Sequence, residues 1–278
     1  MEQLGTAGRS AGPERLVLIG ANIAHSRSPR IHNHLFTLYS LPYRYDLMPL
    51  DESQVVAALA EMKRGGYRGA NVTSPHKRAV LPAIDALSPE AARIGAVNTI
   101  VIQDGRAIGH NTDAAGFTGP LRGHAITAAP FSANVLGTGG AAMAAVHALL
   151  AFPTLRTLTI YSRDADRARN AAARWEDGRL RGAMPGSYSP ADLLVNATPI
   201  GLPASPGMPI AAVELAGTRL VYEMVYSPPE TSLAAAARAA AIEVIGGQAM
   251  FVAQALRAFQ LWTGIAPQPE DVPADLWR

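Results

Sequence analysis

Short apolar runs alternate along the chain with longer stretches whose apolar residues recur at helical spacing. The run RLVLIG, residues 15–20, predicts a buried strand, and SPRIHNHLFTLYS, residues 28–40, has the spacing of an amphipathic helix. The alternation continues with a strand at 43–50, a helix at 53–64 and a strand at 67–74. Ser53 is the N-cap that we expect for the second of these helices. Strands alternating with helices of this length predict an α/β fold with a mainly parallel sheet.

The segment VNTIVIQDGRAIGHNTD, residues 97–113, predicts two strands joined by a tight turn. Asp104-Gly105 stands at its centre, and such a dipeptide favours a two-residue hairpin loop because both positions tolerate positive φ. We expect the first domain to close near residue 118. Residues 1–14 contain no apolar run, and we expect them to form a disordered tail.

The second half of the chain restarts the alternation around a glycine-rich turn. The segment ANVLGTGGAAMAAVHALL places Gly137, Gly139 and Ala142 at G-x-G-x-x-A spacing, between a predicted strand and an alanine-rich helix. The first glycine permits a tight turn, the second lets a diphosphate approach the backbone, and the small third residue lets the helix pack on the strand. The pattern therefore favours dinucleotide binding over a purely structural turn. Further predicted elements are strands at 157–163, 192–198 and 219–226 and a helix at 165–175.

The residues after the second strand of this half bear on the choice of nucleotide. An acidic residue there usually binds the ribose hydroxyls of NAD, whereas arginine suits the 2′-phosphate of NADP. The chain has Ser162, Arg163 and Asp164, followed by Arg167. At a helix start, Arg163 and Arg167 would lie on one face and hold a phosphate between them. We expect NADP; Asp164 leaves NAD open, and the alternative is that the arginines are ordinary surface charges.

The composition is that of a globular protein large enough to bury a full core, with 278 residues, 49% of them hydrophobic and 17% charged. The formal net charge is +2 and the basic residues are scattered, so no nucleic-acid partner is expected. No segment has the length and apolarity of a transmembrane helix, so no membrane partner is expected either. The absence of cysteine excludes disulfides and thiol nucleophiles and is typical of a cytoplasmic protein.

Lysine is rare in this chain, which has only Lys63 and Lys77. Unlike arginine, a lysine ammonium can give up its proton when its surroundings tune it. Lys77 follows the strand predicted at 67–74, and ligands of open α/β sheets bind beyond that edge. The alternative interpretation of Lys77 is a solvated surface residue.

Hydride transfer to a carbonyl needs a group that protonates the oxygen as negative charge develops on it. Lys77 suits this role, and Asp113 is the carboxylate that we expect beside it. No metal is expected, because the seven histidines form no H-E-x-x-H pair. His32 and His34 lie two apart on a predicted helix and therefore point to different faces.

Eight segments, in order along nearly the whole chain, resemble the shikimate dehydrogenase family. They are HSRSP with IHN, NVTSPHK, GAVNT, GHNTDAAGF, GTGGA, NATPIGL, VYSPPETS and GGQAMFVAQALRAFQLWTG. The resemblance implies an N-terminal α/β substrate-binding and catalytic domain over 1–118, a Rossmann-like domain over 119–246, and a C-terminal helix in 247–278 that returns to the first domain. It also implies reversible, NADPH-dependent reduction of 3-dehydroshikimate to shikimate. Whether such a chain is a monomer or a homodimer stays open.

The resemblance also implies roles for individual residues. Lys77 would deliver the proton, and Asp113 would orient it while binding a substrate hydroxyl. The residues that match the family's substrate-binding positions are Ser26, Ser28, Thr73, Asn98, Tyr226 and Gln254. The residues that match its cofactor-binding positions are Gly137, Thr138, Gly139, Gly140, Ala141, Ser162, Arg163, Asp164, Arg167, Thr198, Pro199, Met224 and Gly247. For Ser28 and Asn98 the alternative is a capping or turn-forming role.

The sequence departs from the family's pattern at two places. Ser162, Arg163 and Asp164 stand where NADP-dependent members often have asparagine, arginine and threonine, and Glu223 stands where aspartate is common. Relatives that act on quinate or an aminoshikimate share the lysine and the aspartate. Quinate or aminoshikimate dehydrogenation is therefore the alternative activity, and a dinucleotide-binding regulator without turnover is the alternative class.

Overall fold

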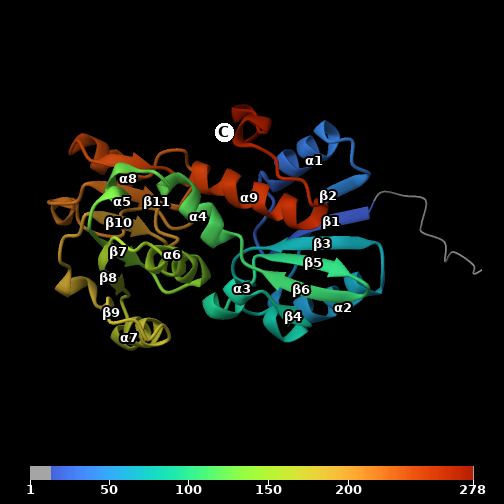
Figure 1. The fold of residues 1–278 in the computed structure, drawn as a ribbon, viewed down its shortest axis with the longest axis horizontal. Coiled ribbons are helices and arrows are strands. Elements are labelled where there is room, and N and C mark those ends of the chain that lie inside the picture. The colour runs from blue at the N-terminus through green and yellow to red at the C-terminus, as the bar shows by residue number, and fades with distance from the viewer. Residues whose placement is uncertain (1–13, 278) are drawn as a thin grey trace, which may run out of the picture.

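The computed structural model describes residues 14–277, which fold into two α/β lobes, each built around a six-stranded sheet (Figure 1). The strands of the first lobe are β1 (Glu14–Gly20), β2 (Tyr43–Pro49), β3 (Tyr67–Val72), β4 (Ala86–Leu87), β5 (Thr99–Gln103) and β6 (Arg106–His110). Their order across the sheet is β2-β1-β3-β5-β6-β4. β1 pairs in parallel with β2 and β3, whereas β5 runs antiparallel to β3 and β6. The first sheet is therefore mixed, with its antiparallel part supplied by the predicted hairpin.

That hairpin turns at Asp104-Gly105, as the sequence predicts. Asp104 has a φ of 51° and Gly105 a φ of 71°. Positive φ at both central residues is the backbone of a type I′ turn, whose twist matches that of the flanking strands. Glu14 is the first residue of β1, so the prediction of a tail through residue 14 is wrong at its last position, and residues 1–13 lie outside the described part of the chain.

The helices of the first lobe are α1 (Ser28–Leu38), α2 (Val55–Arg64) and α3 (Pro89–Ile94), with 3-10 turns η1 (Glu52–Gln54) and η2 (Leu81–Ala83). The next helix, α4 (Asp113–Leu121), starts at the first lobe, and its buried apolar residues belong to the core cluster of the second sheet. The prediction of Ser53 as the N-cap of the second helix is wrong, because η1 precedes α2 and contains Ser53. The Gln54 side chain instead accepts a hydrogen bond of 2.8 Å from the Asp51 backbone N–H. Asp51, with extended backbone, therefore starts this helical segment two residues earlier than expected.

The second lobe has a fully parallel sheet. Its strands are β7 (Phe131–Leu136), β8 (Leu155–Tyr161), β9 (Leu180–Ala183), β10 (Leu193–Asn196), β11 (Leu220–Glu223) and β12 (Glu243–Ile245), in the order β12-β11-β10-β7-β8-β9. Its helices are α5 (Ala125–Ala128), α6 (Gly140–Leu150), α7 (Ala165–Ala173) and α8 (Ser232–Ala239), with 3-10 turns η3 (Pro185–Ser187) and η4 (Ala212–Leu215). The chain starts at the centre of the sheet and winds outward in both directions, which is the doubly wound order of dinucleotide-binding folds.

The C-terminal helix α9 (Gly247–Thr263) leaves the second lobe and packs on the first (Figure 1). Its apolar face shares one core cluster with β1 and α1. Trp262 is fully buried there and donates from Nε1 to the Ile100 carbonyl at 2.9 Å. A Cβ at Gly69 would lie 2.6 Å from that nitrogen, so the helix can approach β3 only because residue 69 is glycine. Two 3-10 turns, η5 (Pro269–Asp271) and η6 (Ala274–Leu276), follow α9.

His32 on α1 is buried in the same cluster, between Tyr45 and Trp262, with ring centroids 4.5 and 5.2 Å away. Neither ring nitrogen has a hydrogen-bond partner of good geometry among the described residues. Burial lowers the pKa of His32 to about 3, and the neighbouring Asn71 amide opposes this effect only in part. His32 is therefore neutral in the folded chain over the whole range of moderate pH.

We expect this histidine to destabilise the fold in acid. The unfolded chain takes up a proton at His32 below its ordinary pKa of 6.5, whereas the folded chain does so only near pH 3. Stability should therefore be unaffected by His32 above pH 6.5 and fall by up to about 1.4 kcal/mol per pH unit between pH 6.5 and 3. Denaturant unfolding at several pH values measures the slope. His32→Phe removes this titrating group, so the free energy of unfolding should fall less steeply with decreasing pH, by up to about 1.4 kcal/mol per pH unit. An unchanged slope would contradict the prediction.

None of the helices in the described part of the chain is long and apolar enough to cross a lipid bilayer.

Candidate active site

Lys77 and Asp113 meet beyond the carboxyl edge of the first sheet. Lys77 lies in the loop after β3, and its backbone carbonyl accepts a hydrogen bond of 2.8 Å from the Val97 N–H. Asp113 is the first residue of α4. Lys77 Nζ lies 2.5 Å from Asp113 Oδ2, and the two side chains are 17% and 7% exposed. The sequence predicted this proximity, and burial from bulk water strengthens the interaction between the charges.

Asn98 holds the second oxygen of the same carboxylate. Its Nδ2 donates to Asp113 Oδ1 at 2.7 Å, and its Oδ1 accepts from the Thr112 backbone N–H at 2.7 Å. The second contact fixes which end of the amide faces Asp113. Both carboxylate oxygens are thus held by donors, one from Lys77 and one from Asn98, so the carboxylate has little freedom to rotate.

A chain of buried polar side chains continues from Asn98 into the first lobe. Thr99 Oγ1 donates to Asn98 Oδ1 at 3.0 Å and accepts from Asn71 Nδ2 at 3.0 Å. Asn71 Oδ1 in turn accepts from the Tyr45 hydroxyl at 2.7 Å. Burial raises the pKa of Tyr45 well above its ordinary value, so this hydroxyl remains a donor. This network could not be predicted from the sequence, because only the fold brings Tyr45, Asn71 and Thr99 together.

The predicted serines lie side by side at the start of α1. Ser26 Oγ donates to Ser28 Oγ at 3.2 Å, and Ser28 is 6% exposed. Arg27, not Ser28, is the N-cap residue, and Pro29 occupies the first turn. Ser28 therefore does not cap the helix, contrary to the structural alternative. Among the described residues, the Ser28 hydroxyl makes no hydrogen bond to a backbone N–H in the first turn of α1.

Thr73, Tyr226 and Gln254 come from three different parts of the fold. Thr73 follows β3 and donates its N–H to the Ile19 carbonyl at 2.9 Å. Tyr226 follows β11 and stacks on Phe251 of α9 at 4.5 Å, and burial raises its pKa. Gln254 on α9 donates to the Phe251 carbonyl at 2.9 Å. The roles of these three side chains stay predictions.

α9 brings Gln254 close to the helix that begins with Asp113. A Cβ at Gly116, three residues after Asp113, would lie 2.8 Å from Gln254 Cβ and 3.0 Å from the Met250 carbonyl. Any side chain at residue 116 would push α9 away from α4. The glycine therefore permits the close approach that places Gln254 on the Asp113 side of the first lobe.

The glycine-rich turn of the second lobe faces Lys77. Gly137 has a φ of 110°, and a Cβ there would lie 3.0 Å from the Ala197 carbonyl. α6 begins at Gly140 with Gly139 as N-cap, without a side-chain cap and without an acidic residue in its first turn. A Cβ at Gly140 would lie 3.6 Å from Lys77 Cδ and 3.2 Å from Ala96 Cβ. Thr138 and Ala141 lie in the same turn, so its free backbone N–H groups suit an anion placed directly beside Lys77.

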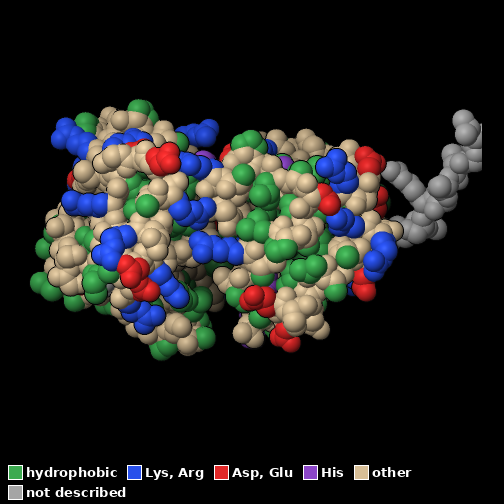
Figure 2. All heavy atoms as spheres, turned by 90° about the horizontal axis from the view of Figure 1, so that it is seen from below, with side chains coloured by type: hydrophobic (Ala, Val, Ile, Leu, Met, Phe, Trp, Pro, Cys, Tyr) green, Lys and Arg blue, Asp and Glu red, His purple; other side chains and the backbone are tan. Residues whose placement is uncertain are grey.

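The space-filling view shows the surface hollowed between the two lobes, with Lys and Arg side chains beside the hollow (Figure 2). Among the described residues, no three His, Asp or Glu side chains lie close enough together to hold a metal ion.

The residues after β8 have a different geometry from the predicted clamp. Arg163 precedes α7, so the helical spacing that would align it with Arg167 does not apply. Asp164 is the N-cap of α7 and accepts from the N–H groups of Asp166 at 2.9 Å and Arg167 at 3.1 Å. Its second oxygen lies 3.5 Å from Arg167 Nε. Asp164 thus has a structural role. Arg163, next to Ser162, is exposed, and none of the ion pairs of the described residues includes it.

The remaining cofactor candidates lie at the same sheet edge as the glycine-rich turn. Thr198 follows β10, and its hydroxyl donates to Asn196 Oδ1 at 2.7 Å, with the exposed Pro199 next to it. Met224 follows β11, and a Cβ at Gly247 would lie 2.7 Å from its carbonyl. Ligands of open α/β sheets bind at this edge, so the positions suit a nucleotide that extends from the turn.

Glu223, which departs from the family's aspartate, is a buried structural residue. It accepts from Asn196 Nδ2 at 2.9 Å, from the Thr231 hydroxyl at 2.8 Å and from the Val225 N–H at 2.9 Å. Burial raises its pKa, and these donors oppose the shift. The glutamate side chain links the ends of β10 and β11 to the start of α8. The change from aspartate to glutamate is therefore structural and does not indicate a different reaction.

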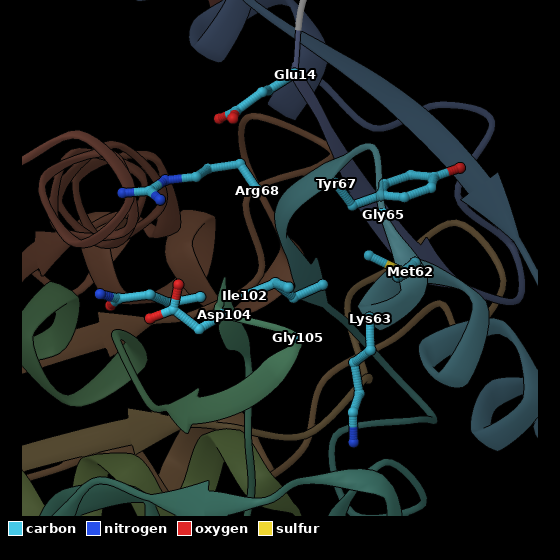
Figure 3. A pocket seen from close by; sticks show the side chains of 10 residues that line it. Glu14, Met62, Lys63, Gly65, Tyr67, Arg68, Ile102, Asp104 and Gly105 are labelled. Carbon is cyan, nitrogen blue, oxygen red and sulfur yellow. The ribbon is translucent and has the colours of Figure 1, made fainter. Parts of the chain in front are cut away.

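A separate pocket of about 220 Å³ lies where β3 begins, at the opposite end of that strand from Lys77 (Figure 3). Glu14, Arg68 and Asp104 point to one side of it, whereas Lys63 points away. Lys63 instead pairs with Asp85 at 2.8 Å. The pocket contains none of the predicted site residues.

Comparison with known proteins places the chain in one family. The family described as shikimate dehydrogenase substrate binding domain matches residues 18–100. The chain is 38% identical to the shikimate dehydrogenase (NADP(+)) of Chlorobium phaeobacteroides, over 95% of this chain and 96% of that protein.

Solved structures agree with the sequence match. A shikimate 5-dehydrogenase from Thermus thermophilus, in complex with NADP(H) and shikimate, superposes with a TM-score of 0.84 at 35% identity, covering 92% of this chain and 96% of that one. A quinate dehydrogenase from Corynebacterium glutamicum, in complex with NAD, superposes with a TM-score of 0.81 at 32% identity, covering 93% and 96%. Because the fold, the arrangement of the site and the identity over nearly the whole length agree, the chain belongs to the shikimate dehydrogenase family.

Proposed function

We propose that this protein is an NADP-dependent oxidoreductase that interconverts 3-dehydroshikimate and shikimate. The observation that carries the proposal is the Lys77–Asp113 ion pair, which lies against the glycine-rich turn of the other lobe. The names of the relatives support the reaction, since the Chlorobium protein is a shikimate dehydrogenase (NADP(+)) and the Thermus structure holds NADP(H) and shikimate.

The side chains of the site supply a proton and hold the substrate. The bound nicotinamide supplies a hydride to the carbonyl carbon in one direction and accepts it in the other. Lys77 donates a proton to the carbonyl oxygen as negative charge develops there, and takes it back in the reverse direction. Asp113 keeps the ammonium in position and accepts a hydrogen bond from a substrate hydroxyl, while Asn98 fixes the carboxylate.

Most of the residues that would bind the substrate have short polar side chains, as a small polyhydroxylated acid requires. Ser26 and Ser28 would bind its carboxylate, Thr73, Asn98 and Gln254 its ring hydroxyls, and Tyr226 would close the pocket. Each buried substrate hydroxyl left without a partner costs about 1 to 3 kcal/mol. Dense hydroxyl and amide groups at fixed positions therefore select this ligand class over less oxygenated acids.

The second lobe would hold the dinucleotide. The diphosphate would lie on Gly137, Thr138, Gly139, Gly140 and Ala141, with the adenosine end near Ser162, Arg163, Asp164 and Arg167, and the nicotinamide end near Thr198, Pro199, Met224 and Gly247. NADP is favoured over NAD because Asp164 is engaged as a helix cap while Arg163 stays free for a 2′-phosphate. We assign residues 1–118 to the substrate domain, 119–246 to the dinucleotide-binding domain and 247–278 to the segment that returns to the first domain. We also propose that the enzyme is cytoplasmic.

The second candidate is quinate oxidation with NAD, which the structural match to the Corynebacterium enzyme favours. A two-by-two assay separates the candidates, with shikimate or quinate as substrate and NADP+ or NAD+ as oxidant, followed by the absorbance of the reduced nicotinamide. We expect shikimate with NADP+ to give the highest kcat/KM, at least about tenfold above the other three pairs. Quinate with NAD+ as the best pair would replace the proposal with the second candidate, and no turnover with any pair would contradict both.

A further inference from the structure

Arg78 extends from the substrate-binding lobe to the glycine-rich turn of the other lobe. It follows Lys77 directly, and its Nη2 lies 3.4 Å from the Thr138 carbonyl. The backbones around it are also close, since a Cβ at Gly140 would be 3.7 Å from Lys77 Cβ. The guanidinium therefore lies beside the N–H groups at the start of α6, and its one hydrogen bond to residues 14–277 is the long contact with Thr138.

Two further arginines, Arg93 and Arg174, lie on the same side of the molecule as Arg78, since the charges of Arg78 and Arg93 both act on Arg174. None of the ion pairs in the described part of the chain includes Arg78, Arg93 or Arg174. Arg93 of α3 donates to the Trp175 carbonyl at 2.6 Å, and Arg174 lies 3.4 Å from the Ile94 carbonyl. Burial, and then the charges of Arg78 and Arg93, lower the pKa of Arg174, as expected for cations that lie near one another. Such a cluster beside a helix N-terminus attracts an anion with more than one charge.

We propose that Arg78 binds the diphosphate of the dinucleotide from across the cleft. This inference rests on the proposed function, because it needs a dinucleotide on the glycine-rich turn. The turn supplies N–H donors from the second lobe, and Arg78 supplies two parallel N–H donors from the first. A diphosphate held in this way contacts both lobes, so the bound cofactor would link the lobe that carries Lys77 to the lobe that carries the glycine-rich turn. Arg163 would contact the other end of the same molecule.

The test is the dissociation constant of NADP+ for the whole protein, measured without substrate, in the wild type, in Arg78→Ala and in Arg78→Lys. Arg78→Ala should weaken NADP+ about tenfold or more, which is the scale of one charge-assisted bidentate contact. Arg78→Lys should lie between the two, because it keeps the charge and loses the fork geometry. Arg64→Ala, at the exposed end of α2, is the matched control and should not change the affinity.

Adenosine 2′-monophosphate serves as the second probe, since it carries the 2′-phosphate and no diphosphate. Its inhibition constant, as a competitor of NADP+ in the oxidation of shikimate, should agree within about twofold between the wild type and Arg78→Ala. Equal affinity of the wild type and Arg78→Ala for NADP+ would overturn the inference. So would an equal loss of affinity for NADP+ and adenosine 2′-monophosphate in Arg78→Ala, because it would show a general electrostatic effect. If the wild type itself does not bind NADP+, the proposed function fails, and this inference fails with it.

Discussion

Replacing Lys77 with alanine should lower kcat by at least about a hundredfold, while the affinities for substrate and cofactor change by much smaller factors. The reason is that the ammonium acts on the oxygen only as charge develops on it, so its loss affects the transition state more than the bound ground state. A lost general acid typically costs between about 10² and 10⁴ in rate. Steady-state kinetics in both directions, together with equilibrium binding of each ligand, measure the two effects separately.

Lys63 is the matched control, because it is the other lysine of the chain and also pairs with an aspartate. Lys63 Nζ lies 2.8 Å from Asp85, and both residues belong to the first lobe. Lys63→Ala removes an ion pair of the same type at a place remote from the glycine-rich turn, so kcat should stay within about twofold of wild type. Near-normal turnover in Lys77→Ala would contradict the assignment of Lys77 as the proton donor.

Trp262→Ala should lower the free energy of unfolding by about 3 to 5 kcal/mol, the usual cost of emptying a buried tryptophan site. Trp262 is fully buried where α9 meets the first sheet, and its Nε1 donates a hydrogen bond to the Ile100 carbonyl. Its removal leaves a cavity and breaks the Nε1 hydrogen bond in the same place. Urea unfolding followed by circular dichroism measures the loss.

Leu261→Ala is the control for that experiment, since Leu261 is the preceding residue of α9 and is only partly buried. It should cost clearly less than Trp262→Ala. Equal losses for the two variants would show that α9 does not depend on the Trp262 contact to hold the first lobe.

The sequence predicted the order of the main elements well, because their hydrophobic periodicity comes directly from which faces are buried. The hairpin at Asp104-Gly105 and the glycine-rich turn at Gly137 followed from backbone conformations that few residues adopt. The ends of the strands were predicted less well. β3 ends at Val72, whereas the prediction extended to residue 74, and β8 ends at Tyr161, whereas the prediction extended to residue 163. At both places the chain leaves the sheet after its last paired residue and forms the loops of the site.

The candidate site was predictable only where a residue type is informative by itself. Lys77 stood out because lysine is rare, and the parallel-sheet rule placed it at the correct edge. The clamp of Arg163 and Arg167 was predicted with the wrong geometry, since sequence spacing does not show where α7 begins. Arg78 was missed because its meaning depends on Thr138 in the other lobe, sixty residues away along the chain.

The most direct test of the Lys77–Asp113 chemistry is the rate of a single turnover, in which each substrate molecule accepts one hydride. Wild type or Lys77→Ala, with NADPH already bound, is mixed rapidly with a smaller amount of 3-dehydroshikimate, at protein concentrations high enough to bind all of it. The account predicts that both proteins bind both ligands and that the loss of nicotinamide absorbance is at least about a hundredfold slower in Lys77→Ala. Equal rates in the two saturated complexes would contradict it.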